Sequence, residues 1–580
     1  MKKKVLLLTF GAVLFVGCGK DAAKNEVPDL NAPVTTVITI DEAQTYQSID
    51  GFGASLTDSS AWLLACAMTP AQRQAVLEEL FDPEKGIGLS YLRQPMGTSD
   101  FRVSSSIGGH DDYTYDDMPL GQSDYELSHF SIAKDEKYII PVLQEIVAIS
   151  PEVKLMGSPW SAPHWMKQGE NLGGGRLKDD VYDTYAHYFV KYIQAYAEHG
   201  LTLNAITLQN EPWFEPGSYH GTRMEPTDQI KLVKKMGPLF AANGLDTEIL
   251  VWDHNWDQPQ YPIEILSDAE AKKYVAGTAW HHYYGDVSSQ TVVHNAHPDR
   301  DTHFTEGSNG SWQKPGFGRN FIRTTREMIG VLRNWSKSFI TWNLALDTEN
   351  GPKIPGGCDT CYGVITINQS SGEVSRRPQY YTFGHSSKFV RPGAYRIDSA
   401  DSGAVDIENV AFKNHDGSRV VIALNSESSA QMIRVNCNGQ SFKYLMPARA
   451  VATFVWDDQP DSSVQVWLTT GDQTKLLSRE ADVVFVACNK EAVTDIKEAE
   501  VQYLRITAED YISKMKAGWI GQMAGVGWGG PPEFNYLERT TPDDEAPEWK
   551  PEMINQLNQV DIYAATTFLR TLELYGFDVS

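Results

Sequence analysis

Two glutamates are the residues of this sequence best suited to acid–base and nucleophilic chemistry. Glu211 follows the apolar run of AITLQNEP, and Glu306 follows that of THFTEGS. A single Glu after a strand is ordinarily solvated surface. Two carboxyls that face each other can cleave a glycosidic bond, one protonating the leaving oxygen and the other attacking, or activating water, at the anomeric carbon. The pair has this chemistry only if the fold brings the two side chains together.

Eight short apolar runs between residues 48 and 346 predict such a fold. Most precede a stretch of helical periodicity, which is typical of alternating strands and helices. This alternation favours an α/β fold, a (β/α)8 barrel at residues 49–385, over an open sheet. The runs are SIDGFGASLTD, GLSYLRQP, VKLMGSPW, AITLQNEP, EILVWDHN, YVAGTAWHHYY, THFTEGS and SFITWNLAL. Active sites of such barrels lie at the carboxyl ends of the strands. Glu211 in run four and Glu306 in run seven would therefore face each other, Glu211 as acid/base and Glu306 as nucleophile.

The sequence after the barrel alternates apolar and polar residues, with turn signals such as NHDGS. This period of two is typical of a β-sandwich, which we place at residues 386–457. The run VTTVITI, within residues 33–48, would supply the first strand of that sandwich. Both ends of the module would then meet in one small domain packed on the barrel.

The first 32 residues are predicted to be an export signal and a polar tether. Three lysines precede an apolar run that is too short for a comfortable membrane span, and the run ends in LFVGC, which resembles a bacterial lipobox. Cys18 would then carry a lipid and anchor the protein in the bacterial cell envelope, at the outer membrane or the cell surface. A plain secretory signal is the alternative. No other segment of the sequence is apolar enough to cross a bilayer.

The composition narrows the range of partners. The 580 residues include 75 acidic and 50 basic ones, a formal charge of -25, and the only lysine-rich run is at the N-terminus. A nucleic-acid partner or an anionic membrane surface is therefore not expected. The 15 Trp and 26 Tyr suit stacking on sugars, although a large aromatic core would also use them.

The cysteines suggest one local crosslink. Cys358 and Cys361 have C-x-x-C spacing in GCDTC, but no second pair or His cluster accompanies them. Outside the cytoplasm, a disulfide is favoured over a zinc site. Cys66 and Cys437 are expected in the core.

Nine stretches, spread over residues 33–457, resemble a family 30 glycoside hydrolase, the family that includes glucosylceramidases and endo-β-1,6-glucanases. They are YQSIDGFGASLTDSSAWLL, GLSYLRQPMGTSDF, YTYDD, GSPWSAPHWMK, ITLQNEP, WDHNWD, THFTEGS, WNLALD and YYTFGHSSKFVRPGA. The resemblance implies a barrel with a side sandwich and a retaining mechanism through a covalent glycosyl-enzyme. It implies no metal or organic cofactor.

The resemblance also implies roles for single residues. Glu211 in NEP matches the acid/base of the family, and Glu306 in FTE matches its nucleophile. Positions that match the lining of the site for the reacting sugar are Asp100, Trp160, Asn210 and Trp342. Positions that match the surroundings of the nucleophile are Arg93, His281 and Tyr283. The tryptophans would stack on the pyranose, Asp100 and Asn210 would bond its hydroxyls, and the last three would orient and stabilise Glu306.

The last part of the chain, residues 458–580, does not continue this pattern. VQVWLTTGDQTKLLSREADVVF resembles a strand that precedes a family 30 module, and the segments from EDYISKMKAGWIGQMAGVGWGG onward resemble the beginning of an ADP-ribosylglycohydrolase-like domain, an all-helical, metal-binding fold. Val560 and Asp561 stand where that family has paired acids. We therefore expect a linker and an incomplete, partly helical second module.

Three functional hypotheses follow. The leading one is an exported retaining β-glycosidase acting on β-glucosides, either an endo-β-1,6-glucanase or a glucosylceramidase, with a polysaccharide favoured as substrate because of the acidic surface and the tether. The second is a catalytically inactive glycan-binding surface lipoprotein, which loss of either Glu211 or Glu306 would indicate; both are present. The third is ADP-ribose chemistry from the tail, which lacks an expected metal ligand.

Overall fold

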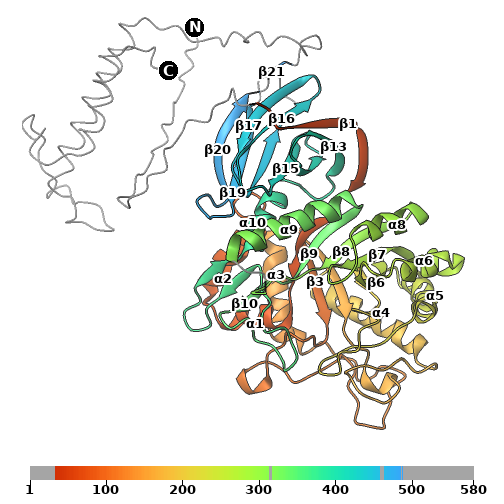
Figure 1. Ribbon diagram of the computed structural model, residues 1–580. Coiled ribbons are helices and arrows are strands. Elements are labelled where there is room, and N and C mark those ends of the chain that lie inside the picture. Colours follow the sequence, from red (N-terminus) through yellow and green to blue (C-terminus); the bar gives the residue numbers. More distant parts are fainter. Residues whose placement is uncertain (1–32, 313–315, 458–462, 485, 488–580) are drawn as a thin grey trace, which may run out of the picture. The chain divides into compact units, whose positions relative to one another are not determined.

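A closed barrel of eight parallel strands forms the larger part of the protein (Figure 1). The computed structural model describes residues 33–312, 316–457, 463–484 and 486–487. Each of the eight predicted runs overlaps one barrel strand, and β9 pairs with β2 to close the ring. The barrel strands are β2 (Gly51–Ser55), β3 (Tyr91–Met96), β4 (Lys154–Pro159), β5 (Leu203–Thr207), β6 (Glu248–Asn255), β7 (Val275–His281), β8 (Asp301–Glu306) and β9 (Ser336–Asn343). The predicted fold class is confirmed.

Helices connect and surround these strands (Figure 1). Thr69 begins α2 with a capping box, in which its hydroxyl accepts from the Gln72 N–H and the Gln72 side chain accepts from the Thr69 N–H. The α-helices are α1 (Asp58–Cys66), α2 (Pro70–Phe81), α3 (Ile139–Ile149), α4 (Tyr182–Glu198), α5 (Pro226–Ala242), α6 (Gln260–Ser267), α7 (Ala269–Lys272), α8 (Ser288–Ala296), α9 (Gly316–Arg333) and α10 (Pro378–Ser386). The short 3-10 helices are η1 (Ser105–Ile107), η2 (Asp135–Lys137) and η3 (His164–Met166).

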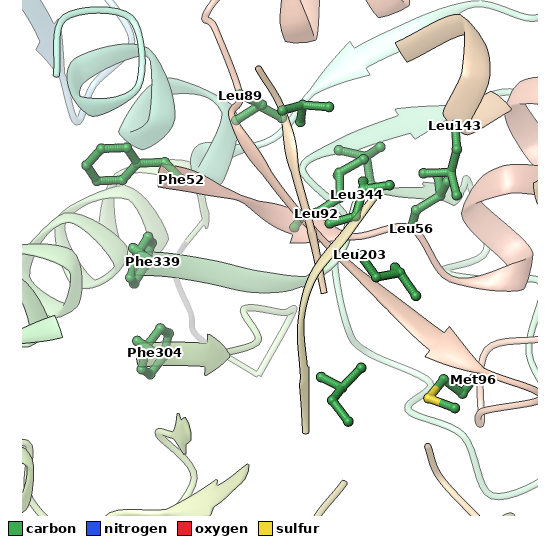
Figure 2. Packing of buried hydrophobic residues seen from close by; sticks show 14 of the residues in the cluster. Phe52, Leu56, Leu89, Leu92, Met96, Leu143, Leu203, Phe304, Phe339 and Leu344 are labelled. Carbon is green, nitrogen blue, oxygen red and sulfur yellow. The ribbon is translucent and has the colours of Figure 1, made fainter. Parts of the chain in front are cut away.

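Alternation along the strands separates two cores. In β3, Tyr91 packs with Met156 and Ala205 inside the barrel, whereas Leu92 belongs to the layer between strands and helices. Side chains two residues apart share a face of a strand, so Arg93 lies on the same side as Tyr91, nearer the carboxyl end. Figure 2 shows the outer layer, in which the stacked rings of Phe304 and Phe339 lie 5.2 Å apart, and Leu92 and Leu344 come from different segments.

The second domain is a β-sandwich built from both ends of the module, as predicted. β1 lies between β13, to which it is antiparallel, and β16, to which it is parallel. The strands are β1 (Thr36–Ser48), β13 (Tyr395–Gly403), β14 (Glu408–Lys413), β15 (Arg419–Asn425), β16 (Gln431–Cys437), β17 (Gln440–Met446), β18 (Ala450–Trp456), β19 (Ser463–Thr470), β20 (Ser478–Val484) and β21 (Val486–Ala487).

The sandwich extends past residue 457, where the sequence analysis ended it. β19 pairs antiparallel with β18, and β20 pairs with β19. Val464, Val466 and Leu468, spaced by two, enter the sandwich core. The sequence analysis assigned residues 458–580 to a linker and a second module, but the apolar alternation in VQVWL supplies a further buried strand face of the sandwich.

Barrel and sandwich share a continuous apolar layer. In β15, Val420 and Ile422 pack into the barrel-side core, whereas Val421 and Ala423 point into the sandwich. Helix α9 contacts β14, β15 and β18, and α10 contacts β18. Figure 1 shows α9 below the sandwich strands, on the side of the barrel. One strand is therefore buried on both faces, which explains its continuous apolar run.

A small sheet of β10 (Ala345–Asp347), β11 (Ile365–Ile367) and β12 (Val374–Arg376) follows the last barrel strand. Between β10 and β11, Cys358 and Cys361 form the predicted disulfide. Cys437 is buried, as expected, but Cys66 is exposed because it ends α1 on the surface.

Cys18 and residues 488–580 lie outside the described part of the chain, and with them the lipid-anchor and ADP-ribosylglycohydrolase-like predictions. Within the described residues, every helix is too short or too polar to span a bilayer.

Candidate active site

A cavity of about 460 Å³ opens where the barrel strands end. Glu306 is the last residue of β8, and Glu211 follows β5 in the chain. Three atoms lie within 4.8 Å of one another: one carboxylate oxygen of Glu211, one of Glu306, and a ring nitrogen of His281. The structure thus brings both glutamates to one cavity.

Glu211 lies in the loop after β5 rather than at the strand end, because β5 stops at Thr207. Its φ of 48° is uncommon for a residue other than glycine. The Glu211 N–H donates to the carbonyl of Asp253 at 3.0 Å, which holds this conformation. Its Oε1 lies 3.2 Å from Nδ1 of His281, so one hydrogen bond orients the carboxyl.

Glu306 is 5 % exposed and held by two donors from other strands and loops. Arg93 Nη1 lies 2.5 Å from Oε2, and the Tyr283 hydroxyl donates to Oε1 at 2.9 Å. Arg93 also donates to the side-chain oxygen of Asn210 at 2.7 Å. Four residues predicted from the resemblance therefore form one connected network.

Asp253, which the sequence analysis did not single out, is the centre of that network. Its carboxylate is fully buried and accepts from Arg93 at 2.8 Å, while His281 Nε2 lies 3.0 Å away. Three hydroxyls donate to the same carboxylate, those of Ser158, Thr207 and Thr305. The sequence did contain a signal for Asp253: the polar residues of WDHN follow the apolar run EILV, at the end of a barrel strand, where side chains reach the active site.

Asp253 also departs from regular strand geometry. Its φ of 63° accompanies a register shift between β6 and β7 at this point. Burial raises the pKa of Asp253, but Arg93 and His281 lower it more, so it lies well below its ordinary value. Asp253 therefore stays ionised and fixes both cations relative to the glutamates.

Burial and nearby cations set the protonation of the site. Burial raises the pKa of Glu211, but the hydrogen bond with His281 brings it below its ordinary value. Burial raises the pKa of Glu306, and His281 and Arg93 oppose that rise without cancelling it. Burial lowers the pKa of His281, yet Glu306 and Asp253 raise it to about 9. His281 therefore carries a proton at neutral pH.

Asp100 reaches the same cavity from the loop after β3. Burial, and then the charges of Glu306 and Glu211, raise its pKa to about 8. The carboxyl is consequently neutral at pH 7 and able to donate a hydrogen bond to a bound hydroxyl.

Trp160 and Trp342 line the cavity but stack on each other, with ring centroids 5.0 Å apart. They are only 2 % and 4 % exposed, so their faces are largely covered. Arg93 lies over Trp160, 4.9 Å from the ring centroid. These tryptophans form a rigid floor rather than open stacking platforms.

Exposed aromatic rings occur instead around the mouth of the cavity. Phe214, Tyr284 and Trp312 are 44 %, 70 % and 46 % exposed, and Tyr283 is 38 % exposed. The sequence analysis did not select the first three, because nothing local distinguishes a loop aromatic at a cavity from one elsewhere.

Glu211, His281 and Glu306 also have donor types that can bind a divalent cation. Arg93 and protonated His281 already place two positive charges beside these carboxylates. A further cation would be repelled, so these residues fit proton transfer better than metal binding.

A (β/α)8 barrel with two facing glutamates, an arginine on one and a histidine on the other, defines a glycoside hydrolase. The chain belongs to glycosyl hydrolase family 30. The TIM-barrel domain of that family matches residues 49–390, and its beta sandwich domain matches residues 393–454. The predicted family and enzyme class are thus confirmed.

Two relatives and one solved structure illustrate what the chain is similar to. The chain is 32% identical over 477 residues to the endo-1,6-beta-D-glucanase neg1 of Aspergillus fumigatus, covering 76% of this chain and 93% of that one. It is 30% identical over 449 residues to the lysosomal acid glucosylceramidase of Mus musculus, covering 73% and 84%. Among solved structures, the endo-beta1,6-glucanase BT3312 is 36% identical with a TM-score of 0.67, covering 73% of this chain and 94% of that one.

Proposed function

We propose that this family 30 hydrolase cleaves β-1,6-glucan internally, with Glu306 as nucleophile and Glu211 as acid/base. The observation that carries the mechanism is the separation of their facing oxygens, within 4.8 Å. Retaining pairs stand about 5–5.5 Å apart, whereas inverting pairs leave room for water at about 6.5–9.5 Å. The short separation supports direct attack by one carboxylate.

In the first step, an oxygen of Glu306 attacks the anomeric carbon while Glu211 gives its proton to the glycosidic oxygen. The carbon–oxygen bond to the leaving group breaks, and a covalent glycosyl-enzyme forms. In the second step, Glu211 takes a proton from water, whose oxygen attacks the anomeric carbon and releases Glu306. Both catalytic groups return to their starting protonation.

The resting pKa directions, lowered for Glu211 and raised for Glu306, favour the opposite assignment. We assign the roles from the donors. A carboxylate that accepts from a guanidinium and a phenol is stabilised as an anion, which suits Glu306 as nucleophile. His281 can return a proton to Glu211 across their 3.2 Å hydrogen bond, which suits Glu211 as acid.

The substrate is inferred from the cavity and the relatives. The endo-β-1,6-glucanase neighbours are slightly more similar in sequence than the lysosomal glucosylceramidase. Four partly exposed aromatic rings at the cavity mouth offer contacts to more than one sugar. A polysaccharide is therefore favoured over a lipid glucoside.

Product analysis with the full chain tests the substrate. β-1,6-Glucan should yield short oligosaccharides early in the reaction, and glucosylceramide vesicles should yield little glucose. Early release of glucose alone, or faster cleavage of the ceramide, would assign the glucosylceramidase activity instead. If the protein binds glycan but hydrolyses none of these substrates, the hypothesis of a catalytically inactive glycan-binding protein would be favoured.

Azide rescue of two variants tests the roles. With 2,4-dinitrophenyl β-glucoside, whose leaving group needs no proton, Glu211→Ala should accumulate glycosyl-enzyme, and azide should restore turnover as β-glucosyl azide. Glu306→Ala should lose roughly 10³-fold or more of its activity, and azide should give the α product. Interchanged product configurations would show that the two roles are reversed.

We further propose that the protein is exported and lipid-anchored at Cys18, on the strength of the lipobox-like LFVGC alone. In a bacterial host, the full chain should incorporate an alkyne fatty acid and partition into detergent, and Cys18→Ala should do neither. Secretion of an unlabelled wild-type protein would instead indicate the plain signal peptide. The resemblance of the C-terminal segment to an ADP-ribosylglycohydrolase-like domain stays a prediction, and we assign no activity to it.

A further inference from the structure

A disulfide-closed turn forms part of the catalytic cavity wall. Cys358 and Cys361 both line the cavity that contains Glu211 and Glu306. Cys361 is 5 % exposed and packs in a small apolar cluster with Trp160 and Trp342, which form the cavity floor. The crosslink is therefore built into the site.

The same turn holds the loop that carries Trp312. The Ser311 N–H donates to the Thr360 carbonyl at 2.9 Å, and Gly310 forms a β-bridge with Cys361. The Tyr362 N–H donates to the Asn309 carbonyl at 2.8 Å. These two hydrogen bonds together make up the Gly310–Cys361 bridge, and they align two loops that are distant in the sequence.

Gly310 allows the Trp312 ring to lie close to this backbone. A Cβ at position 310 would collide with both the Trp312 ring and the Thr360 carbonyl. The ring is consequently confined against the loop while 46 % of the residue stays exposed at the cavity. A confined aromatic face is a suitable surface for stacking, since little side-chain freedom is lost on binding.

We infer that Trp312 and the Cys358–Cys361 turn form a second sugar subsite, adjoining the reacting sugar, in which the indole stacks on a neighbouring glucose unit. This inference rests on the proposed glucan hydrolysis. Trp160 and Trp342 stack on each other and are almost fully buried, so they offer little ring face to a second sugar. The disulfide acts as a positioning element that keeps the turn, and through it Trp312, in place.

Comparison of two substrates tests the subsite. Gentiotetraose spans several sugar sites, whereas β-glucosyl fluoride has one sugar and no second ring. Trp312→Ala should lower kcat/KM for gentiotetraose by roughly tenfold, the scale of one lost hydrophobic contact in a binding site, mainly through KM. The loss for the fluoride should be several times smaller, and Trp312→Phe should recover part of the gentiotetraose activity.

The disulfide is tested by the double variant Cys358→Ser/Cys361→Ser. It should weaken gentiotetraose cleavage in the same direction as Trp312→Ala, and Gly310→Ala should do likewise by displacing the ring. Dithiothreitol should impair the wild type but not the double variant, which separates this crosslink from the other thiols. Thermal unfolding of each variant identifies any that fails to fold.

Tyr395→Ala is the matched control, because Tyr395 is also 46 % exposed but does not line the cavity. It should leave both substrates unaffected. Equal losses on both substrates for folded Trp312→Ala, or no loss on either, would overturn the subsite while leaving glucan hydrolysis intact. Failure of the wild type to cleave gentiotetraose would instead overturn the proposed function, and the subsite with it.

Discussion

At the residue scale, the site depends on a buried carboxylate that touches neither glutamate side chain. Asp253 is bound to both Arg93, which holds Glu306, and His281, which holds Glu211. Arg93 is fully buried, so its charge requires anionic partners, and Asp253 and Glu306 supply them. Asp253 is therefore a positioning residue that links the two halves of the proposed catalytic pair.

Asp253→Asn should affect both stability and the pH profile. Loss of the carboxylate leaves Arg93 buried with one partner fewer, and breaking such pairs costs about 3–5 kcal/mol of unfolding free energy. The pKa of His281, now about 9, should fall, so the alkaline limb of kcat/KM should move to lower pH. Urea unfolding and a pH–rate profile measure the two effects.

Asp179→Asn is the control, because that side chain is 91% exposed. Its unfolding midpoint and pH profile should match the wild type. If Asp253→Asn lowers the stability but leaves the alkaline limb of kcat/KM where it is, Asp253 has only a structural role.

At the scale of elements, strands β2 and β3 approach each other closely, and this pairing positions the loops that follow them at the cavity. A Cβ at Gly53 would overlap the backbone carbonyl of Tyr91, and backbone cannot move aside as a flexible side chain can. Only glycine allows this strand pairing, in which Gly53 lies opposite Tyr91.

Gly53→Ala should therefore destabilise the protein by about 1–3 kcal/mol, the usual cost of overpacking. Gly330→Ala provides the contrast. It lies inside α9, where the nearest atom to a new Cβ is 3.9 Å away, so the variant should gain up to about 1 kcal/mol from helix propensity. If the urea midpoint changes equally in Gly53→Ala and Gly330→Ala, the close approach of β2 and β3 does not determine the need for glycine at position 53.

At the scale of the whole described module, a buried histidine joins barrel and sandwich. His385, in α10, contacts the hydroxyl of Thr453 through Nδ1 at 2.8 Å and that of Thr469 through Nε2 at 2.9 Å. Burial lowers its pKa to about 3. The ring is therefore neutral in the folded state and bonds one strand with each nitrogen.

This histidine should make the module acid-sensitive. Between about pH 6.5 and pH 3 the unfolded chain binds a proton at His385 that the folded protein does not, so acidification favours unfolding and stability rises with pH in this window. Buried His254 and His303, whose pKa values burial lowers to about 4, act in the same direction. Unfolding midpoints in urea should fall steadily from pH 7 to pH 4.

His385→Gln keeps a neutral donor and acceptor, so the fall in midpoint should be shallower than for the wild type. His187→Gln, at an exposed side chain on α4, should keep the wild-type slope. Identical slopes for His385→Gln and the wild type would show that this ring does not contribute to acid unfolding.

The sequence by itself determined the order of the barrel strands, the two-ended sandwich and the two candidate catalytic glutamates. Each is encoded by a local pattern: apolar and polar alternation in strands such as β16, and an apolar run that ends in a polar residue before Glu211 and Glu306. Arg93, His281 and Tyr283 were accessible only through the family resemblance.

Only the tertiary structure decided how side chains from different strands meet. The role of Asp253, the mutual stacking of Trp160 and Trp342, and the position of Trp312 against a disulfide turn all depend on contacts between segments far apart in the chain. Periodicity specifies which face of an element is buried, but not which rotamer or partner fills the buried space. The strands after residue 457 joined the sandwich for the same reason, since pairing with β18 outweighed the linker-like sequence between them.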